Sequence, residues 1–266
     1  ILSMPKENTI KIAWSGLHFG EEPPLVGERG AGTIFFSGCN VKCVFCQNWQ
    51  ISQEGLGKYY AQEEFKKMMM DLQRKGALNI DLVSPTIWAE RIKQPILEAK
   101  KEGLNIPVVW NSNAYESVEM LKDFEGLVDF YLPDFKYGDN EIAFKYSGVN
   151  NYVEKAKEAV SEMIRQVGVE KVIVRHMILP NNVGNSKKAL KFIRELDADI
   201  CLSLISQYEP TFKATEFPEI NRNVNEKEFK EVFSYATEMG LEKGWVQDLE
   251  SHDKFLPDFK KENPFC

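Results

Sequence analysis

The chain has 266 residues, of which 43% are hydrophobic, and a formal net charge of −7. This length suits a single α/β barrel, and the hydrophobic fraction is ordinary for a globular protein with a large core. The acidic balance disfavours a nucleic-acid substrate, which would require a basic face. No apolar stretch approaches the ~18 residues that cross a membrane, and no signal peptide is visible.

The five cysteines are an odd number, and three of them are clustered, which does not fit a disulfide framework. Thiols that are kept for metal binding indicate a reducing compartment. We therefore expect a cytoplasmic protein without a membrane or nucleic-acid partner.

Residues 1–30 show little periodicity and are rich in Gly, Pro and charge, so we expect an N-terminal extension. From residue 31 to residue 210, short apolar runs alternate with amphipathic segments. The runs that predict buried strands are Thr33–Ser37, Leu78–Val83, Pro107–Asn111, Val128–Pro133, Lys171–Ile178 and Asp199–Ser206. The helical stripes between them are centred on Met69, Ile92, Leu121, Val160 and Ile193, and Asn185-Ser186 is the predicted cap of the last of these helices.

Alternating strands and helices predict a parallel sheet with right-handed crossovers. Six strands are fewer than the eight of a complete TIM barrel, so the sequence predicts an α/β fold with a partial (β/α)6 TIM-like barrel. This is an open parallel sheet with outer helices. Chemistry in such barrels takes place at the carboxyl ends of the strands.

Residues 211–266 lose the alternation, and we expect one helix and a tail there. Asn225 and Glu228 form a capping-box pattern that predicts a helix to about Met239. The aromatic and apolar residues of the tail are expected to pack on the barrel; they are Trp245, Phe255, Leu256, Phe259 and Phe265.

Three cysteines lie directly after the first predicted strand, with the spacing C-x3-C-x2-C; they are Cys39, Cys43 and Cys46. Three thiolates on one short loop can hold three corners of an iron–sulfur cube. No fourth cysteine lies nearby, so one iron would stay open for another ligand.

Two alternatives remain for these cysteines. Their spacing is also one face of an α-helix, which would make them buried core thiols, although Gly38 and Asn40 fit a helix poorly. A structural zinc site would need a fourth ligand, and the candidates, Cys201, Cys266 or a histidine, are far away in the sequence.

The cysteine spacing, with the aromatic Phe45 before the third cysteine, resembles the cluster loop of the radical S-adenosylmethionine (SAM) superfamily. The following Gln47-Asn48 is similar to the end of that loop in pyruvate formate-lyase activating enzymes and their relatives. This resemblance implies a [4Fe–4S] cluster, SAM bound at the open iron, and a one-electron reductant such as flavodoxin or ferredoxin. It also implies reductive SAM cleavage and hydrogen abstraction from a substrate, with contacts from Phe45 and Asn48 to the cofactors.

Further cofactor-binding residues are expected at the strand ends. Alternation places Asp134 and Lys136 on one side of the fourth strand, together with Leu132. The activating enzymes carry a similar Asp-x-Lys, so Lys136 is expected to meet the SAM carboxylate. Arg175 lies in an otherwise apolar strand, where it needs a partner, and its Arg-x4-Pro pattern resembles the activating enzymes. His176 points the opposite way and is expected to be packed or hydrogen-bonded.

Three strand ends depart from the activating-enzyme pattern. Ser84-Pro85-Thr86 stands where those enzymes have a Gly-Gly-Glu turn, so the hydroxyls of Ser84 and Thr86 are expected to replace the carboxylate. Asn111 and Asn113 stand in a segment close to the family's Asp-Thr-Asn-Gly. Gln207 follows the sixth strand and is expected to bond the ribose hydroxyls. These changes leave SAM use in place and put the substrate in doubt.

The substrate remains open at this stage. A glycine of a partner protein is one interpretation, and a small molecule or peptide is the other. A non-enzymatic protein that stores metal or transfers electrons is the alternative from a different class.

Overall fold

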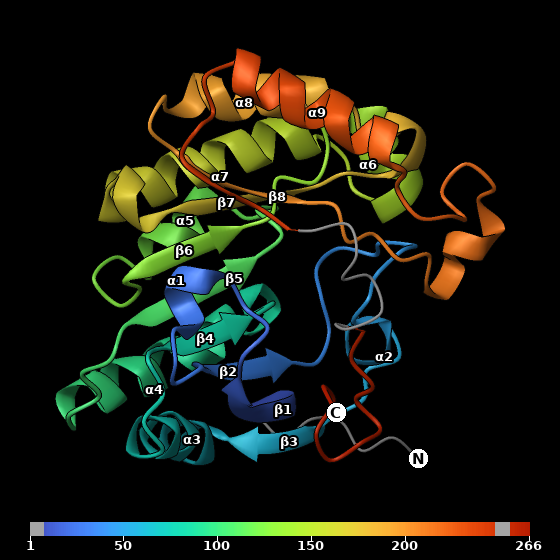
Figure 1. Ribbon diagram of the computed structural model, residues 1–266. Helices are drawn as coiled ribbons and strands as arrows, with labels where there is room; N and C mark the ends of the chain where they lie inside the picture. The colour runs from blue at the N-terminus through green and yellow to red at the C-terminus, as the bar shows by residue number, and fades with distance from the viewer. Residues whose placement is uncertain (1–7, 248–255) are drawn as a thin grey trace.

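The computed structural model describes residues 8–247 and 256–266, so Phe255 and His252 lie outside the described residues. Figure 1 shows one α/β architecture in which most strands run side by side and point the same way, whereas the first strand, residues 9–18, runs antiparallel to its two neighbours. A six-stranded sheet has the order β3-β1-β2-β4-β5-β6, and a three-stranded sheet has the order β7-β8-β9. Two parallel bridges, Tyr131 to Val172 and Asp134 to Arg175, join β6 to β7 and continue the sheet across this gap.

All six strands expected from the apolar runs are present, and they pair in parallel in chain order within the two sheets. They are β2 (Ala31–Phe36), β4 (Ile80–Val83), β5 (Val108–Ser112), β6 (Phe130–Pro133), β7 (Ile173–Met177) and β8 (Cys201–Ile205). The prediction of an open, partial TIM-like barrel is confirmed. A further short strand, β9 (Gly244–Val246), pairs in parallel with β8.

The helices expected from the apolar stripes also form, and their apolar faces pack against the outside of the sheet in one continuous core. They are α3 (Gln62–Arg74), α4 (Ala89–Lys101), α5 (Val118–Lys122), α7 (Tyr152–Val167), α8 (Ser186–Leu196) and α9 (Glu226–Glu238). Asn225 and Glu228 make the reciprocal capping bonds expected for α9, each 3.0 Å long. Asn185 precedes α8 but makes no side-chain cap bond; Asn182 Oδ1 accepts the hydrogen bond of Ser186 N instead.

The N-terminal segment is more ordered than its composition indicates. Residues 9–18 form β1 (Thr9–His18), which pairs antiparallel with β2 and with β3 (Lys58–Ala61). The short helix α1 (Pro23–Val26) then lies in front of β4 and β5, on the face opposite the outer helices (Figure 1). Leu25 packs there with Val109, Leu132 and Ile173. This segment therefore fills part of the barrel interior.

Two more short helices complete the described chain, α2 (Trp49–Ser52) after the cysteine loop and α6 (Asn140–Ser147) after β6. Among the described residues, no helix is both long and apolar enough to cross a membrane. The C-terminal segment packs as expected, because Phe259 and Phe265 contact Phe35 at ring-centroid distances of 5.2 and 5.5 Å. Trp245 lies in β9, whereas Leu256 is exposed.

Candidate active site

A cavity of about 540 Å³ opens at the carboxyl ends of the parallel strands, where the cysteine loop and α2 also lie. Its volume is in the range of small-molecule and cofactor sites. It is lined by all three clustered cysteines and by nine of the ten residues expected to bind cofactors, namely Phe45, Asn48, Ser84, Asn111, Asn113, Asp134, Lys136, Arg175 and Gln207. The tenth, Thr86, does not line it.

The cysteine loop follows β2 through a tight turn at Gly38, whose φ is +93°. Residues with a Cβ rarely adopt this φ, so the turn favours glycine. Backbone bonds fix the loop on both sides: Gly38 N donates to Ile51 O (2.9 Å), and Val44 N donates to Tyr146 O (2.8 Å). The loop is not a helix, so the cysteines do not form a helical core stripe.

The three thiols are unbridged, and each lies near a neutral polar group. Asn113 Nδ2 donates to Cys39 Sγ (3.4 Å) and Ser147 Oγ donates to Cys43 Sγ (3.0 Å). Cys46 Sγ lies 3.2 Å from Ser52 Oγ. Burial raises the pKa of Cys43 and raises that of Cys46 to about 12. A bound metal would deprotonate such thiols. The donor set of three soft sulfur atoms facing one cavity fits an iron–sulfur cluster.

Phe45 and the following residues shape the wall beside the thiols. The Phe45 ring is buried and contacts Tyr137 and Tyr208 at 6.4 and 5.8 Å between ring centroids. Asn48 is the N-cap residue before α2, and its carbonyl accepts hydrogen bonds from Ile51 N and Ser52 N. Gln47 Nε2 donates to the Gln207 carbonyl (3.3 Å), which connects the loop to the end of β8.

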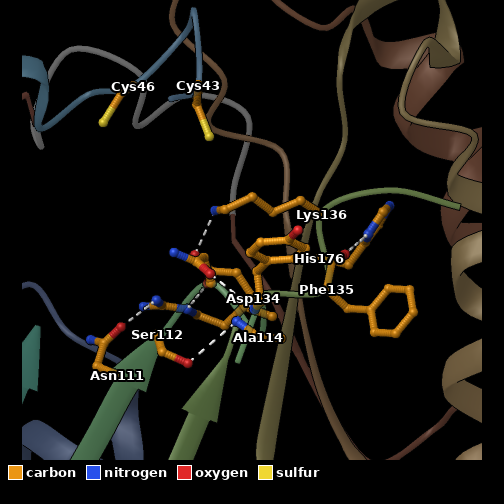
Figure 2. Close-up of polar contacts among 12 residues, drawn as sticks. Cys43, Cys46, Asn111, Ser112, Ala114, Asp134, Phe135, Lys136 and His176 are labelled. Carbon is orange, nitrogen blue, oxygen red and sulfur yellow. Dashed lines mark hydrogen bonds and ion pairs between the residues drawn. The ribbon is translucent and has the colours of Figure 1, made fainter. Parts of the chain in front are cut away.

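Asp134, Lys136 and Arg175 form one ion-pair group below the thiols. Lys136 Nζ lies 2.7 Å from Asp134 Oδ2, and Arg175 Nε lies 2.6 Å from Asp134 Oδ1. Figure 2 shows the sulfur atom of Cys43 pointing toward the amino end of Lys136. Burial opposes ionisation of Asp134, but Arg175 and Lys136 outweigh it and hold the pKa of this carboxyl below its usual range.

Arg175 also bonds two residues on other elements. Its Nη1 lies 3.0 Å from Glu21 Oε1 and its Nη2 donates to Asn111 Oδ1 (2.6 Å). Asn111 Nδ2 in turn donates to Glu21 Oε2 (2.9 Å). The partner that the buried arginine requires is therefore an acceptor set formed by Asp134, Glu21 and Asn111.

The acidic residues of the N-terminal segment were not expected in the site. Beside Glu21, Glu22 lies in the barrel interior, where Ser203 Oγ donates to both of its oxygens (3.0 Å) and Trp245 Nε1 donates to Oε2 (2.5 Å). Burial raises the pKa of Glu22, and the positive charge of Arg175 partly offsets this rise. From the sequence, only the need of Arg175 for a partner could be predicted. The identity of Glu21 as that partner and the position of Glu22 could not.

The turn after β4 holds Ser84 in the cavity wall with φ of +56° and leaves Thr86 outside it. Thr86 Oγ1 donates to Glu116 Oε1 (2.7 Å). Glu116 is buried and also accepts hydrogen bonds from Trp110 Nε1 and Ser112 Oγ, both 2.8 Å. This unexpected carboxylate therefore ties the β4 turn to the end of β5.

Tyr152 and His176 bond the backbone behind the cavity. The Tyr152 hydroxyl accepts from Lys136 N (2.8 Å) and lies 2.8 Å from the Asp134 carbonyl. His176 is fully buried, and its Nδ1 lies 2.7 Å from the Phe135 carbonyl, on the side away from the cysteines (Figure 2). It is thus packed and hydrogen-bonded, as the strand alternation predicts. Tyr152 was expected only as a helix core residue.

A family profile described as "Radical SAM superfamily" matches residues 33–193, which is more than half of the chain. This range includes the cysteine loop, β4 to β7 and most of α8. The resemblance found in the cysteine spacing is confirmed at the level of the superfamily.

Relatives and solved structures agree with that match. The chain is 37% identical over 236 residues to "Uncharacterized protein MJ0674" of Methanocaldococcus jannaschii, covering 85% of this chain and 67% of the relative. The hydrogenase maturase HydG from Carboxydothermus hydrogenoformans aligns with a TM-score of 0.52 at 12% identity, over 79% of this chain and 50% of HydG. The radical SAM methyltransferase TsrM from Kitasatospora setae aligns with a TM-score of 0.51 at 12% identity. The alignment covers 66% of this chain and 36% of TsrM. The chain thus spans half or less of these solved proteins, which are similar in fold.

Proposed function

This chain belongs to the radical SAM superfamily, and from that premise we propose that it uses one [4Fe–4S] cluster to cleave SAM reductively and to take hydrogen from a substrate. Membership supports reductive SAM cleavage in general. The observation that carries the proposal for this chain is that Cys39, Cys43 and Cys46 line one cavity together with the charged strand ends.

Cys39, Cys43 and Cys46 would hold three irons, and the cavity beside them has room for SAM. When bound, the cluster and SAM would supply one-electron reductive cleavage, with a flavodoxin or ferredoxin as the electron donor and with methionine and 5′-deoxyadenosine as products after hydrogen is taken from the substrate. The protein positions these groups and excludes water from them.

Lys136 is the side chain best placed to receive the SAM carboxylate. Its ammonium group has one ion-pair partner, Asp134, and it has two further N–H donors. The opposite charge of Asp134 holds the Lys136 pKa above its usual range despite burial, so the donor stays charged. Asp134 would accept the SAM amine, and the hydroxyl of Ser84 would complete that contact.

Arg175 would act mainly on its neighbours. Its guanidinium already bonds Asp134, Glu21 and Asn111. It would therefore hold Asp134 and Asn111 in place around the cofactor. Asn113, Phe45, Asn48 and Gln207 line the same cavity, where they could contact the adenine and ribose. Thr86 has a different function in this proposal, because its hydroxyl is bonded to buried Glu116.

For the substrate, we propose a backbone glycine in a protein or peptide, as in an activating enzyme. The support is the cysteine loop with Phe45 and Asn48 and the Asp134-x-Lys136 pair, which resemble those enzymes. The volume of the cavity, about 540 Å³, which SAM must share, favours a small molecule as the alternative. A metal-storage or electron-transfer protein is the alternative without SAM chemistry.

The test is a turnover assay on anaerobically reconstituted protein with reductant and SAM. Formation of 5′-deoxyadenosine is the expected result, and an iron-loaded protein that forms none would be an electron carrier or metal store. Adding candidate glycyl radical proteins and recording electron paramagnetic resonance then separates the substrates. A stable doublet split by one α-hydrogen supports activation, whereas SAM cleavage stimulated only by a small metabolite supports the alternative.

A further inference from the structure

His18 is a histidine in the wall of the active-site cavity to which the superfamily chemistry assigns no function. It is the last residue of β1, it lines the cavity, and only 9% of its surface is exposed. The centroid of its ring lies 4.1 Å from that of Phe265 and 6.1 Å from that of Phe35, and the contact with Phe35 is T-shaped. Phe35 of β2 and Phe265 of the C-terminal segment thus contact this imidazole and each other.

The ring nitrogens of His18 have no hydrogen-bond partner in the described part of the chain. The other buried polar side chains of the cavity wall all have one: Glu22, Ser52, Asn111, Ser112 and Asn113. Buried polar groups in native proteins are almost always hydrogen-bonded, because an unmet donor or acceptor loses its contacts with water. The His18 nitrogens are not among the fully buried polar atoms without a partner in the described residues, so they are open to water or to a ligand in the cavity that His18 lines.

The imidazole is uncharged at neutral pH. Burial lowers the pKa of His18 to about 4. A neutral imidazole offers one N–H donor and one nitrogen acceptor. It therefore suits a partner that presents both an acceptor and a donor, and it offers no charge to a carboxylate or phosphate.

The charged residues of the cavity wall are already paired with one another or with polar groups. Asp134 binds Arg175 and Lys136, Arg175 also binds Glu21, and Glu22 accepts from Ser203 and Trp245. An ionic substrate group would therefore compete for partners that the protein already uses, or with the SAM carboxylate and amine that we assign to Lys136 and Asp134. A neutral group near His18 displaces none of these contacts.

Two aromatic rings, tilted by 41° to each other, lie beside the imidazole. Phe35 and Phe265 are 5.5 Å apart between ring centroids and both line the cavity. Aromatic faces favour planar partners. A peptide amide is planar and neutral, and it carries one donor and one acceptor.

We propose that His18 is the substrate-recognition residue of this cavity, and that it hydrogen-bonds an uncharged amide of the substrate lying against Phe35 and Phe265. This inference rests on the proposed function in that both use the same cavity. It restricts the substrate class to peptides and other amides, and it disfavours carboxylates, phosphates and amines.

The test measures binding of N-acetylglycinamide to reconstituted protein saturated with SAM, by ligand-observed NMR and without reductant, so that the positions assigned to the SAM carboxylate and amine are filled. We expect weak binding in the wild type, about tenfold weaker binding in His18→Phe, which keeps the ring and removes the nitrogens, and partial recovery in His18→Asn. Acetate and methylammonium should bind more weakly than the amide. Phe233→Ala, at an exposed position on α9, is the matched control and should bind like the wild type.

Equal amide binding by wild type and His18→Phe, or preferred binding of either ion, would overturn the proposal. If His18→Phe does not fold, the ring nitrogens of the three histidines in wild-type protein labelled with ¹⁵N-histidine provide the second measurement. A neutral imidazole whose signals shift with the amide supports the proposal, and no shift overturns it. Amide binding without SAM cleavage would reject the proposed function alone, whereas SAM cleavage without amide binding would reject this inference alone.

Discussion

The cavity has two charged or ionisable regions that differ in how completely they are bonded. In the cysteine loop, Cys39, Cys43 and Cys46 contact only neutral amide or hydroxyl groups. In the ion-pair group below it, Arg175 bonds three acceptors and Asp134 bonds two cations. The cysteine loop therefore remains free to bind a metal. In the ion-pair group, by contrast, most charged atoms already have partners within the protein.

This difference separates residues that bind from residues that position. Thiols without charged partners can become metal ligands at little structural cost. The Arg175 guanidinium, which bonds three acceptors within the protein, instead holds the ends of β5, β6 and β7 together. Lys136 lies between the two regions, since it has one partner and faces the thiols. The predictions below test this division.

The largest effect is expected at the cysteines. Replacing Cys39, Cys43 or Cys46 by Ala removes one corner ligand, so iron content should fall from about four per chain to a small fraction. Iron and sulfide analysis after anaerobic reconstitution measures this. Cys201→Ala and Cys266→Ala are the controls, and an iron loss in them equal to that in the loop variants would place ligands outside the loop.

Asp134→Ala should cost about 2–3 kcal/mol of unfolding free energy, because it leaves two partly buried cations without their shared carboxylate. Lys136→Met is the comparison, and it should cost clearly less because Asp134 keeps its bond to Arg175. Urea unfolding of both variants gives the difference. Equal losses would show that the guanidinium is not the main partner of Asp134.

His176 should make stability depend on pH. Burial lowers its folded pKa from the usual 6.5 to about 4, so the unfolded state binds more protons between these values. Its contribution is complete above pH 6.5 and is lost as the pH falls toward 4, by about 3 kcal/mol. Unfolding of wild type and His176→Phe across this range should show a shallower pH slope in the variant. Parallel curves would mean that His176 is not buried and neutral.

The smallest effect concerns SAM affinity. Lys136→Met should weaken SAM binding about tenfold, the value of one charge-assisted hydrogen bond. Arg175→Lys keeps the positive charge and should weaken it less, since we assign Arg175 a positioning function. Calorimetric titration of SAM into the reconstituted variants provides both constants. A larger loss in Arg175→Lys than in Lys136→Met would reverse this assignment.

Much of the site could be predicted because its signals are local. The cysteine spacing occupies eight residues, and alternation along single strands placed Asp134 beside Lys136 and His176 on the opposite side. The parallel barrel could be predicted because apolar strand-like runs alternate with amphipathic helical segments along the chain. Thr86 illustrates the limit of this reasoning, because the orientation of its hydroxyl depends on Glu116, which lies 30 residues away.

The remaining features depend on contacts between distant segments. Glu21 and Arg175 are separated by 154 positions, and Glu22 and Trp245 by 223. No local period encodes such pairs. The strand β1 was hidden for a different reason: a register shift between Ile12 and Trp14 breaks its alternation, and much of its second half is only partly buried.

The central claim is that the three loop cysteines support SAM cleavage in this cavity. The most direct measurement is the amount of 5′-deoxyadenosine formed over time by reconstituted wild type and by Cys43→Ala, with the same reductant and SAM. The account predicts steady formation by the wild type and none above background by the variant. Formation at the wild-type rate by Cys43→Ala would contradict it.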